Sequence, residues 1–299
     1  MSDRIVTADG KAGPFHLGGP AIFGTEGIAF WDRDVGMVCH AGYDWEDSYG
    51  KWLDLNGLTK KHVRILPYAT SLCQIQHRSD GTYEWIPLQG MDHVLKYTMT
   101  DETLGNAVSE DTIGLYLFIG IADPIFEKLD AIRSIADMKI MWEIGKDREF
   151  GREKISYELT KVEMCSMNSH EAEKMFGIPR DSEKEMLRFL RTLPVEFVFY
   201  RVGSRGAYGI TQNGVWFCPS IVPHGMAVDP SGCGNCSTAA AMYGFAAGMD
   251  MPSVIAGACV AAGYNAMQYG VWPLITDDIR EEAARLRDEL ANRVIMIDV

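Results

Sequence analysis

The sequence predicts an α/β fold in which a central, mostly parallel sheet carries helices on both faces. From residue 114 onward, short apolar runs alternate with helical segments, and such alternation is typical of parallel sheets. Strands are expected at 115–121, 139–144, 164–167 and 195–201, and helices at 125–135, 170–176 and 183–193. No internal repeat or linker interrupts the 299 residues, so we expect a single domain over residues 1–299.

A β-hairpin forms the second observation. Residues 71–76 alternate between apolar and polar side chains, Asp80–Gly81 provides a turn, and residues 82–86 alternate again. A hairpin inside an α/β pattern predicts a small sheet laid over the larger one. We expect this lid to include residues 1–17 and 63–90.

The remaining elements follow from local signals. Helices are expected at 22–31 and 52–58, a short strand at 35–40, and two packed helices within the Gly- and Ala-rich segment 239–267. Asp278 and Glu281 have capping-box spacing, which predicts a last helix from about 278 to 293.

Charge and composition limit the partners. A net charge of −13 and a pI of about 5.0 repel polyanions, so no nucleic-acid partner is expected. No signal peptide or membrane span is predicted, because the apolar segment 239–267 is interrupted by Asp250 and Pro252. Seven scattered cysteines are typical of a reducing compartment, so a cytoplasmic location is expected.

The segment Val228–Ser237 is the strongest candidate for a binding site. Glycines at 232 and 234 precede a small-residue helix, and free N–H groups at a helix start attract anions such as phosphate. A carboxylate would be the expected proton acceptor at the end of this motif. The chain instead has Asn235, whose amide cannot ionise.

Other candidates follow the predicted strands. Because ligands of such sheets bind beyond the carboxyl ends of the strands, these positions are expected to converge. They are Gly42–Asp44, Glu143, Asn168 with Glu171, and Arg201 with Gly203 and Gly206.

Taken in order, these motifs resemble those of the PfkB/ribokinase family of sugar and nucleoside kinases. The segment 229–235 is similar to that family's Asp-Thr-x-Gly-Ala-Gly-Asp signature, and 168–171 to its Asn-x-x-Glu motif. Residues 201–206 are similar to its Thr-x-Gly-x-x-Gly loop, with Arg201 in place of Thr. Gly18–Gly19 and Gly42–Asp44 are similar to its Gly-Gly and Gly-x-Asp motifs. A more particular likeness, carried by Trp142–Glu143 and Asn235, is to the branch that contains the fungal killer-virus maintenance protein.

The resemblance implies a ribokinase-like fold and phosphorylation of a hydroxymethyl group on a sugar or nucleoside, using ATP and Mg²⁺. It places Gly232, Cys233 and Gly234 at the transferring phosphate, Asn235 at the acceptor hydroxyl, and Asp229 on the phosphate and metal side. It implies nucleotide contacts for Arg201, Gly203, Gly206, Ala262, Asn265 and Ala266, and magnesium contacts for Asn168, Glu171 and Glu143. It implies acceptor contacts for Asp9, Gly18, Gly19 and Asp44. It also implies a homodimer through the lid, and leaves open whether K⁺ assists.

Asn235 keeps several functions open, because the family's final Asp is its general base. Loss of a base typically lowers a rate by about 10²–10⁴-fold, so a slow kinase or a kinase with a relocated base (Asp229 or Asp44) remains possible. The alternatives are a catalytically inactive nucleotide- or sugar-binding homologue, and a nucleoside or glycoside hydrolase in the same cleft. The hydrolase would use Asp44, Asp229 or Glu143 to activate water.

Two motifs also have purely structural interpretations. Asn168 and Glu171 have the spacing of a helix cap and its capping-box partner. Cys233 and Cys236 form a C-x-x-C at a helix start, but no further ligand or redox context accompanies them, so small buried residues are the favoured interpretation.

Overall fold

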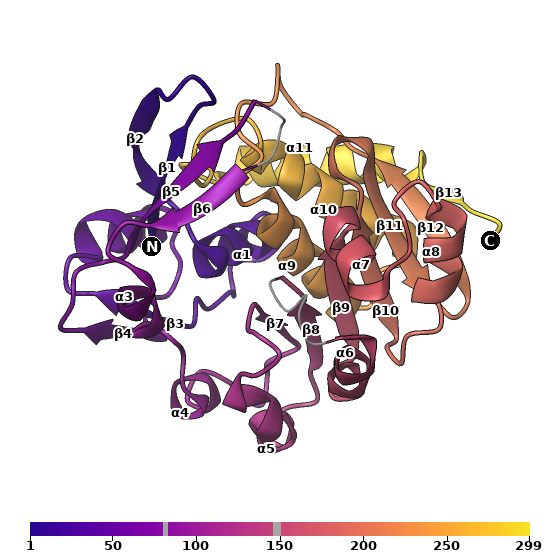
Figure 1. Ribbon diagram of the computed structural model, residues 1–299, viewed down its shortest axis with the longest axis horizontal. Coiled ribbons are helices and arrows are strands. Elements are labelled where there is room, and N and C mark those ends of the chain that lie inside the picture. The colour runs from indigo at the N-terminus through magenta and orange to yellow at the C-terminus, as the bar shows by residue number, and fades with distance from the viewer. Residues whose placement is uncertain (80–82, 146–150) are drawn as a thin grey trace.

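The computed structural model describes residues 1–79, 83–145 and 151–299, which form three layers with a small sheet at one end (Figure 1). The central sheet has the strand order β13-β12-β11-β10-β9-β8-β7. Strands β7 to β10 run parallel, as predicted, and β11 to β13 are antiparallel. The strands are β7 (Gly114–Leu117), β8 (Lys139–Glu143), β9 (Met164–Asn168), β10 (Phe197–Arg201), β11 (Gly206–Thr211), β12 (Gly214–Pro219) and β13 (Ile295–Met296).

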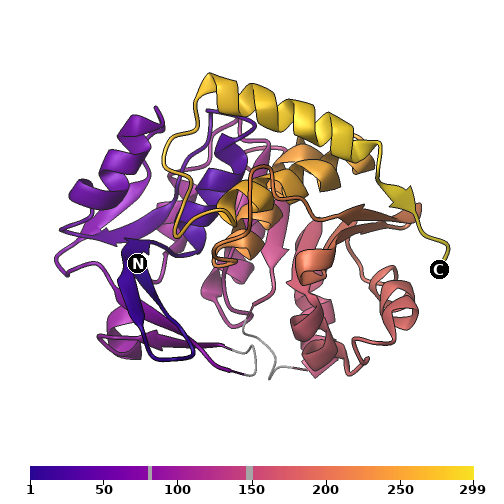
Figure 2. The ribbon, with the colours of Figure 1, turned by 90° about the horizontal axis from the view of Figure 1, so that it is seen from above.

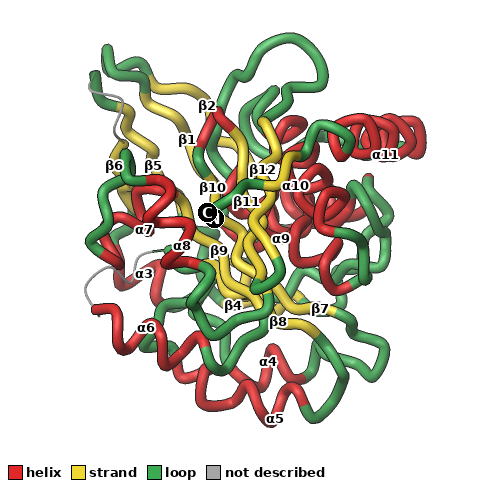
Figure 3. The backbone as a smooth tube through the Cα atoms, turned by 90° about the vertical axis from the view of Figure 1, so that its right-hand side faces the viewer, coloured by secondary structure: helices red, strands yellow, loops and turns green. Residues whose placement is uncertain are grey.

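Helices cover both faces of this sheet, because alternate strand residues point to opposite sides. Met141 and Phe199 pack into one apolar cluster, whereas Trp142 and Val198 pack into the other. Figure 3 shows α9, α10 and α11 on one side of the strands and α6, α7 and α8 on the other. The first layer contains α1 (Pro20–Ala29), α9 (Cys233–Ala246), α10 (Met251–Asn265) and α11 (Asp277–Ala291). The second contains α5 (Leu129–Arg133), α6 (Gly151–Leu159), α7 (Ser169–Phe176) and α8 (Glu183–Leu190).

A four-stranded sheet forms the lid, in the order β2-β1-β5-β6. The predicted hairpin is confirmed as β5 and β6, whereas its turn at Asp80–Gly81 lies outside the described residues. The strands are β1 (Ser2–Val6), β2 (Ala12–Leu17), β5 (Leu72–His77) and β6 (Tyr83–Pro87). Seen from above in Figure 2, these strands lie at the end of the molecule opposite the C-terminus.

A separate parallel pair, β3 (Cys39–Gly42) and β4 (Val63–Leu66), lies below the lid and beyond the β7 edge of the central sheet in Figure 1. The sequence places this strand too early, at 35–40, because the pairing with β4 begins only at Cys39. Around this pair lie a π-helical turn (Glu46–Gly50), α2 (Lys51–Leu55), α3 (Met91–Leu95) and α4 (Asp101–Gly105).

Other expected boundaries also differ from the structure, and the helix expected at 52–58 is α2, which ends at Leu55. The strand expected at 115–121 ends at Leu117. Beyond it, the Ile119 carbonyl accepts a hydrogen bond from the Trp142 indole N–H at 3.0 Å instead of pairing with a strand. The helix expected at 125–135 is a 3-10 turn (Pro124–Lys128) followed by the short α5. The last helix is capped by Thr276, which accepts from the Ile279 N–H, rather than by Asp278. Within the described ranges, no helix is long and apolar enough to cross a membrane.

Candidate active site

The loop before α9 leaves the first N–H groups of that helix without a side-chain cap. The Asp229 carboxylate accepts hydrogen bonds from the N–H and hydroxyl of Ser231, at 3.1 and 2.8 Å, which tightens the turn. Gly232 follows with a φ of 83°, and a Cβ there would lie 2.3 Å from the Phe23 ring. The predicted glycine turn is therefore present, and its uncapped helix start suits an anion.

Arg201 lies directly against this helix start. A Cβ on Gly234 would lie 2.1 Å from the Arg201 Nη1, so only glycine leaves room for the guanidinium. Arg201 forms ion pairs with Glu143 at 2.8 Å and Glu171 at 3.6 Å. Although burial lowers the pKa of Arg201, both carboxylates raise it, and the net shift is upward. Its Nη2 is the atom that faces both carboxylates, and its Nε is buried without a hydrogen-bond acceptor among the described residues.

Asn235 belongs to a hydrogen-bond network that the sequence did not indicate. Its Nδ2 donates to the Tyr116 hydroxyl at 2.9 Å and to the Glu143 Oε2 at 3.0 Å. Tyr116 donates to the same Glu143 oxygen at 2.5 Å. Burial and the neighbouring Glu143 raise the pKa of Tyr116 well above its usual value, so its hydroxyl stays protonated. In the sequence, the only sign that Tyr116 takes part in the site is a polar hydroxyl within an otherwise apolar strand.

Asn168 and Glu171 form the capping box of α7. The Asn168 side chain accepts from the N–H groups of His170 and Glu171, and the Glu171 Oε2 accepts from the Asn168 N–H at 2.7 Å. The structural interpretation of this motif is thus correct. The cap also brings Glu171 to the Arg201 guanidinium, beside the start of α9.

Magnesium would find few protein ligands here. No group of three or more His, Cys, Asp or Glu residues that could hold a metal occurs in the described part of the chain. Mg²⁺ often needs only one or two carboxylates together with substrate phosphates, so Glu171 fits this requirement. Glu143 fits it less well, because one of its oxygens pairs with Arg201 and the other accepts from Tyr116 and Asn235.

The loop that follows Arg201 depends on two glycines. Gly203 has a φ of 63° and Gly206 a φ of 131°, and a Cβ on Gly206 would lie 2.0 Å from the Cys218 carbonyl oxygen. The Val202 N–H donates to the Gly206 carbonyl at 3.0 Å and closes the loop. The loop therefore stands next to the Arg201 guanidinium, at the end of β10.

The end of α10 braces the Asp229 loop. Asn265 is fully buried and donates to the Ser231 carbonyl at 2.8 Å and to the Cys233 sulfur at 3.2 Å. The Ala266 carbonyl accepts from the Asp229 N–H, and the Ala262 carbonyl accepts from the Cys233 thiol. The Asn265 side chain thus supports the loop, and its burial does not suit a direct contact with adenine.

Asp9, which the sequence predicts to contact the acceptor, does not lie beside Gly18 in the structure. It lies in the exposed β1–β2 turn, where the Thr7 hydroxyl donates to its carboxylate. The position beside Gly18 is occupied by Asp3, since a Cβ on Gly18 would lie 1.9 Å from the Asp3 Oδ2. The hairpin pairs Asp3 with His16, two residues before Gly18, which explains the placement.

Asp3 has the properties of a binding carboxylate. Burial raises its pKa to about 6, against the lowering effects of the Met1 amine and the Gly19 N–H, while Asp229 raises it further. Its Oδ1 is buried without a hydrogen-bond donor among the described residues. The interaction with Asp229 places Asp3 on the same side as the start of α9.

The Asp44 carboxylate forms hydrogen bonds within the protein. It accepts from the N–H and hydroxyl of Thr70 at 2.8 and 2.6 Å. Burial raises its pKa, but these hydrogen bonds outweigh burial and hold the pKa below its usual value. Asp44 therefore ties the end of β3 to the segment that enters the lid.

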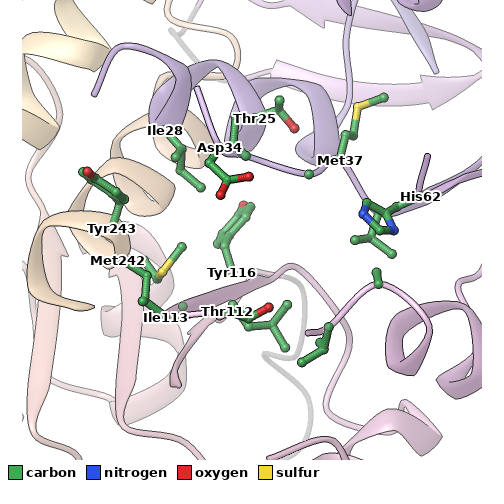
Figure 4. A pocket seen from close by; sticks show the side chains of 18 of the residues that line it. Thr25, Ile28, Asp34, Met37, His62, Thr112, Ile113, Tyr116, Met242 and Tyr243 are labelled. Carbon is green, nitrogen blue, oxygen red and sulfur yellow. The ribbon is translucent and has the colours of Figure 1, made fainter. Parts of the chain in front are cut away.

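Two cavities flank α1. A cavity of about 170 Å³ lies under the lid, lined by Gly18, Gly19, Trp45, Tyr49, Thr70 and Tyr97 among others. A larger one, of about 390 Å³, lies between the segment leading into β3 and β7. Figure 4 shows Tyr116 projecting into the larger cavity, between Met242 and Tyr243 on one side and Met37 and His62 on the other.

The C-x-x-C pair lacks the lowered thiol pKa that is typical of a redox site. Burial raises the pKa of Cys233 to about 12 and that of Cys236 well above its usual value, so both stay protonated. No disulfide bond joins cysteines of the described chain.

Comparisons with known proteins agree with this geometry. The family model described as pfkB family carbohydrate kinase matches residues 6–275. Among solved structures, the chain is similar to Arabidopsis thaliana ribokinase complexed with ribose and ATP, with a TM-score of 0.71, 19% identity, and 96% and 95% of the two chains covered. It is also similar to Burkholderia thailandensis nucleoside kinase in complex with inosine, with a TM-score of 0.72, 18% identity, and 96% and 95% covered. No curated protein sequence matches the chain. The predicted ribokinase-like fold is confirmed.

Proposed function

Because the chain belongs to the pfkB family of carbohydrate kinases, we propose that it transfers the terminal phosphate of ATP to a hydroxymethyl group of a sugar or nucleoside. The observation that carries this proposal is the Arg201 guanidinium packed against Gly234, at an uncapped helix start. A buried cation and free N–H groups at one point stabilise the charge of a transferring phosphoryl group.

The residues divide into two ends. At the phosphate end, the N–H groups of Gly232 and Gly234 hold the transferring phosphate, joined by that of Cys233 once it leaves the Pro230 carbonyl, to which it donates at 3.2 Å. Arg201 stabilises the phosphate charge, and the Gly203–Gly206 loop contacts the remaining phosphates. Asp229 shapes this loop through Ser231. Magnesium, when bound with the nucleotide, would be held by Glu171 and would shield phosphate charge.

At the acceptor end, Gly18 and Gly19 leave space for the substrate and Asp3 accepts hydrogen bonds from its hydroxyls. Asn235 orients the reacting hydroxyl. The amide geometry is fixed because Glu143 is an acceptor, so Nδ2 faces Glu143 and Oδ1 is left to accept from the substrate. Asn235 takes no proton, and loose phosphoryl transfer proceeds slowly without a base.

The substrate classes have support from two neighbours of the same fold, one bound to ribose and one to inosine. The cavity under the lid contains Trp45, Tyr49 and Tyr97, aromatic side chains on which a base or a sugar can stack. A location in the cytoplasm agrees with the seven free cysteines of the described chain.

The proposal is tested with purified protein, Mg²⁺, and a pooled library of sugars and nucleosides, with and without ATP. Mass spectrometry should show an ATP-dependent gain of one phosphate on a member of the library. ATP binding without any phosphorylated product would instead favour the inactive binding homologue. Cleavage products that form without ATP would favour a hydrolase.

Asn235→Asp sharpens this test. Restoring the base should raise the rate by about 10²–10⁴-fold. The gain should be largest at alkaline pH, because a carboxylate there lies about 3.0 Å from Glu143 and like charges raise the pKa of one partner. Asn213→Asp, in the exposed β11–β12 turn, is the matched control and should leave the rate unchanged.

We also propose a homodimer formed through the outer face of the lid. Tyr83 on the edge strand β6 is 66% exposed, and Leu88 just beyond it is also exposed. Light scattering of purified protein should give twice the chain mass, and Tyr83→Lys should return the mass to that of one chain.

A further inference from the structure

The start of α9 has a positive charge that belongs to the protein itself. The Arg201 Nη1 lies 2.1 Å from the position that a Cβ on Gly234 would take, so the guanidinium packs on the first turn of this helix. The Arg201 side chain is only 12% exposed. The helix start has no side-chain cap. An anion at this point therefore meets a fixed cation together with the positive end of the helix.

The same guanidinium stands between two acids for which the resemblance to the kinase family implies magnesium contacts. Its Nη2 lies 2.8 Å from the Glu143 Oε1 and 3.6 Å from the Glu171 Oε2. Glu143 ends β8, Glu171 lies in the first turn of α7, which follows β9, and Arg201 ends β10. Because β8, β9 and β10 are neighbouring parallel strands, these three side chains meet at one edge of the sheet. A divalent cation that bridged the two acids would need the space that Nη2 occupies.

Both oxygens of Glu143 already interact with groups of the protein. Oε1 pairs with Arg201, and Oε2 accepts from the Tyr116 hydroxyl at 2.5 Å and from the Asn235 amide at 3.0 Å. The Glu143 side chain is 5% exposed, so water has little access to these donors. A metal ion on Glu143 would deprive buried donors of their acceptor, which is unfavourable. Glu143 is thus committed to the protein and not to a metal.

Glu171 is held less tightly by the guanidinium. Its pair with Arg201 is the longer one, at 3.6 Å, and its Oε2 also accepts from the Asn168 N–H at 2.7 Å as part of the α7 cap. The longer pair opens more easily, so a magnesium ion that arrives with the nucleotide fits beside Glu171 while Glu143 keeps Arg201 in place. The cation that meets the phosphates before any metal is Arg201.

We propose that the Arg201 guanidinium neutralises triphosphate charge as a divalent cation would, so that this site binds ATP in the absence of metal. The inference rests on the proposed function, because its ligand is the ATP of that reaction. Metal-free ATP carries more negative charge than its magnesium complex, so it gains more from a buried cation beside a helix start. Glu143 opposes this binding little, because Arg201 and two further donors share its charge.

Isothermal titration calorimetry of the full-length protein with ATP, in buffer with Mg²⁺ and in buffer with EDTA, tests this inference. The Kd for ATP should agree within about fivefold between the two buffers. In Arg201→Met, the affinity for metal-free ATP should fall by at least about 100-fold, because the anion loses its buried partner. Arg205→Met is the matched control, since Arg205 lies in the same loop with a side chain 56% exposed, and it should bind ATP as the unaltered protein does.

Mn²⁺ without nucleotide is the probe for a metal ion at the two acids. Its electron paramagnetic resonance spectrum should show about tenfold tighter binding to Arg201→Met than to the unaltered protein. The reason is that Glu143 and Glu171 lose the guanidinium between them and become ligands for the ion.

Glu171→Gln is a second variant that keeps the buried pair of Arg201 with Glu143. Glutamine also accepts from the N–H of a helix cap, so α7 should remain capped. The variant removes one negative charge beside Arg201, so metal-free ATP should bind about tenfold more tightly. Glu173→Gln is the matched control, because Glu173 pairs with Arg180 on the surface of the same helix, and it should leave the Kd unchanged.

The outcomes separate this inference from the proposed function. A Kd for ATP that rises by more than about fivefold when EDTA replaces Mg²⁺ would overturn the inference and leave the proposed function in place. ATP binding in neither buffer would overturn both. Unchanged affinity for metal-free ATP in Arg201→Met would assign the binding to the helix start alone and would also overturn the inference. If Arg201→Met does not fold, an unchanged affinity in Glu171→Gln would overturn it in the same way.

Discussion

The phosphate end and the acceptor end of the candidate site differ in whether their buried charged groups have partners within the protein. At the phosphate end, the buried Arg201 is paired with Glu143 and Glu171. At the acceptor end, burial raises the pKa of Asp3 to about 6, and its Oδ1 has no donor among the described residues. One end is electrostatically complete before a ligand binds, whereas the other is completed by its ligand.

This difference suggests how the two ends recognise their ligands. A phosphate that enters beside Arg201 competes with two carboxylates for an existing cation, so binding there exchanges one ion pair for another. A hydroxyl that donates to Asp3 supplies a hydrogen bond that the protein lacks. The phosphate end should therefore be rigid and the acceptor end should respond strongly to its substrate.

Replacing Arg201 should have the largest effect. Arg201→Met leaves Glu143 and Glu171 buried without their cation, which should lower the free energy of unfolding by about 3–5 kcal/mol. It should also lower kcat/KM for ATP by at least about 100-fold, because the phosphoryl charge loses its buried partner. Thermal unfolding and steady-state kinetics measure the two effects separately.

Arg205→Met provides the comparison, since Arg205 lies in the same loop but pairs with Glu183 at the surface. It should change stability and kcat/KM little. Equal losses in the two variants would mean that the loop, and not the buried cation, matters at the phosphate end.

Replacing Asp3 should have a smaller effect that is confined to the acceptor. Asp3→Asn should lower kcat/KM for the acceptor by about 10–100-fold and leave the KM for ATP unchanged, because a charged hydrogen-bond acceptor is lost. Asp9→Asn, in the exposed turn of the same hairpin, should have no effect.

The pH dependence of Asp3 gives the same prediction a second readout. The ionised carboxylate is the form that accepts from hydroxyls, so acceptor kcat/KM should rise as the pH passes about 6. Since the pKa is raised in the folded protein, the stability contributed by protonated Asp3 is present at low pH and is lost as the pH rises through about 6. An unchanged acid limb in Asp3→Asn would argue against a role for this carboxylate.

Sequence analysis located the phosphate end better than the acceptor end, for a physical reason. Gly232, Gly234 and Asn235 are neighbours in the chain, and a glycine turn before a helix is a local signal. Asp3 reaches Gly18 only through the pairing of β1 with β2, and Tyr116 reaches Asn235 only through the packing of β7 beneath α9. Contacts of this kind depend on tertiary structure, so proximity in the sequence favoured Asp9, which lies in the exposed β1–β2 turn.

The smallest expected effect concerns Glu26, a buried acid of α1. Its Oε1 accepts from the Trp272 N–H at 2.7 Å and its carboxyl group contacts the Cys236 thiol, but burial outweighs both contacts and raises its pKa to about 8. Its stability contribution is therefore present at low pH and is lost as the pH rises through about 8. Glu26→Gln should flatten this decline. At pH 9 it should raise the free energy of unfolding by on the order of 1–3 kcal/mol, which corresponds to a melting temperature higher by a few degrees.

Thermal unfolding of Glu26→Gln and of the exposed control Glu185→Gln, measured from pH 5 to pH 9, decides the matter. If both variants follow the unaltered protein across this range, Glu26 is not held protonated by burial. The layer between α1 and α9 would then be more hydrated than its packing indicates, and the same hydration would extend to Cys236, which contributes to the surroundings of Glu26. A flattened profile for Glu26→Gln alone would show that burial holds Glu26 protonated, as burial also raises the pKa of Asp3 at the acceptor end.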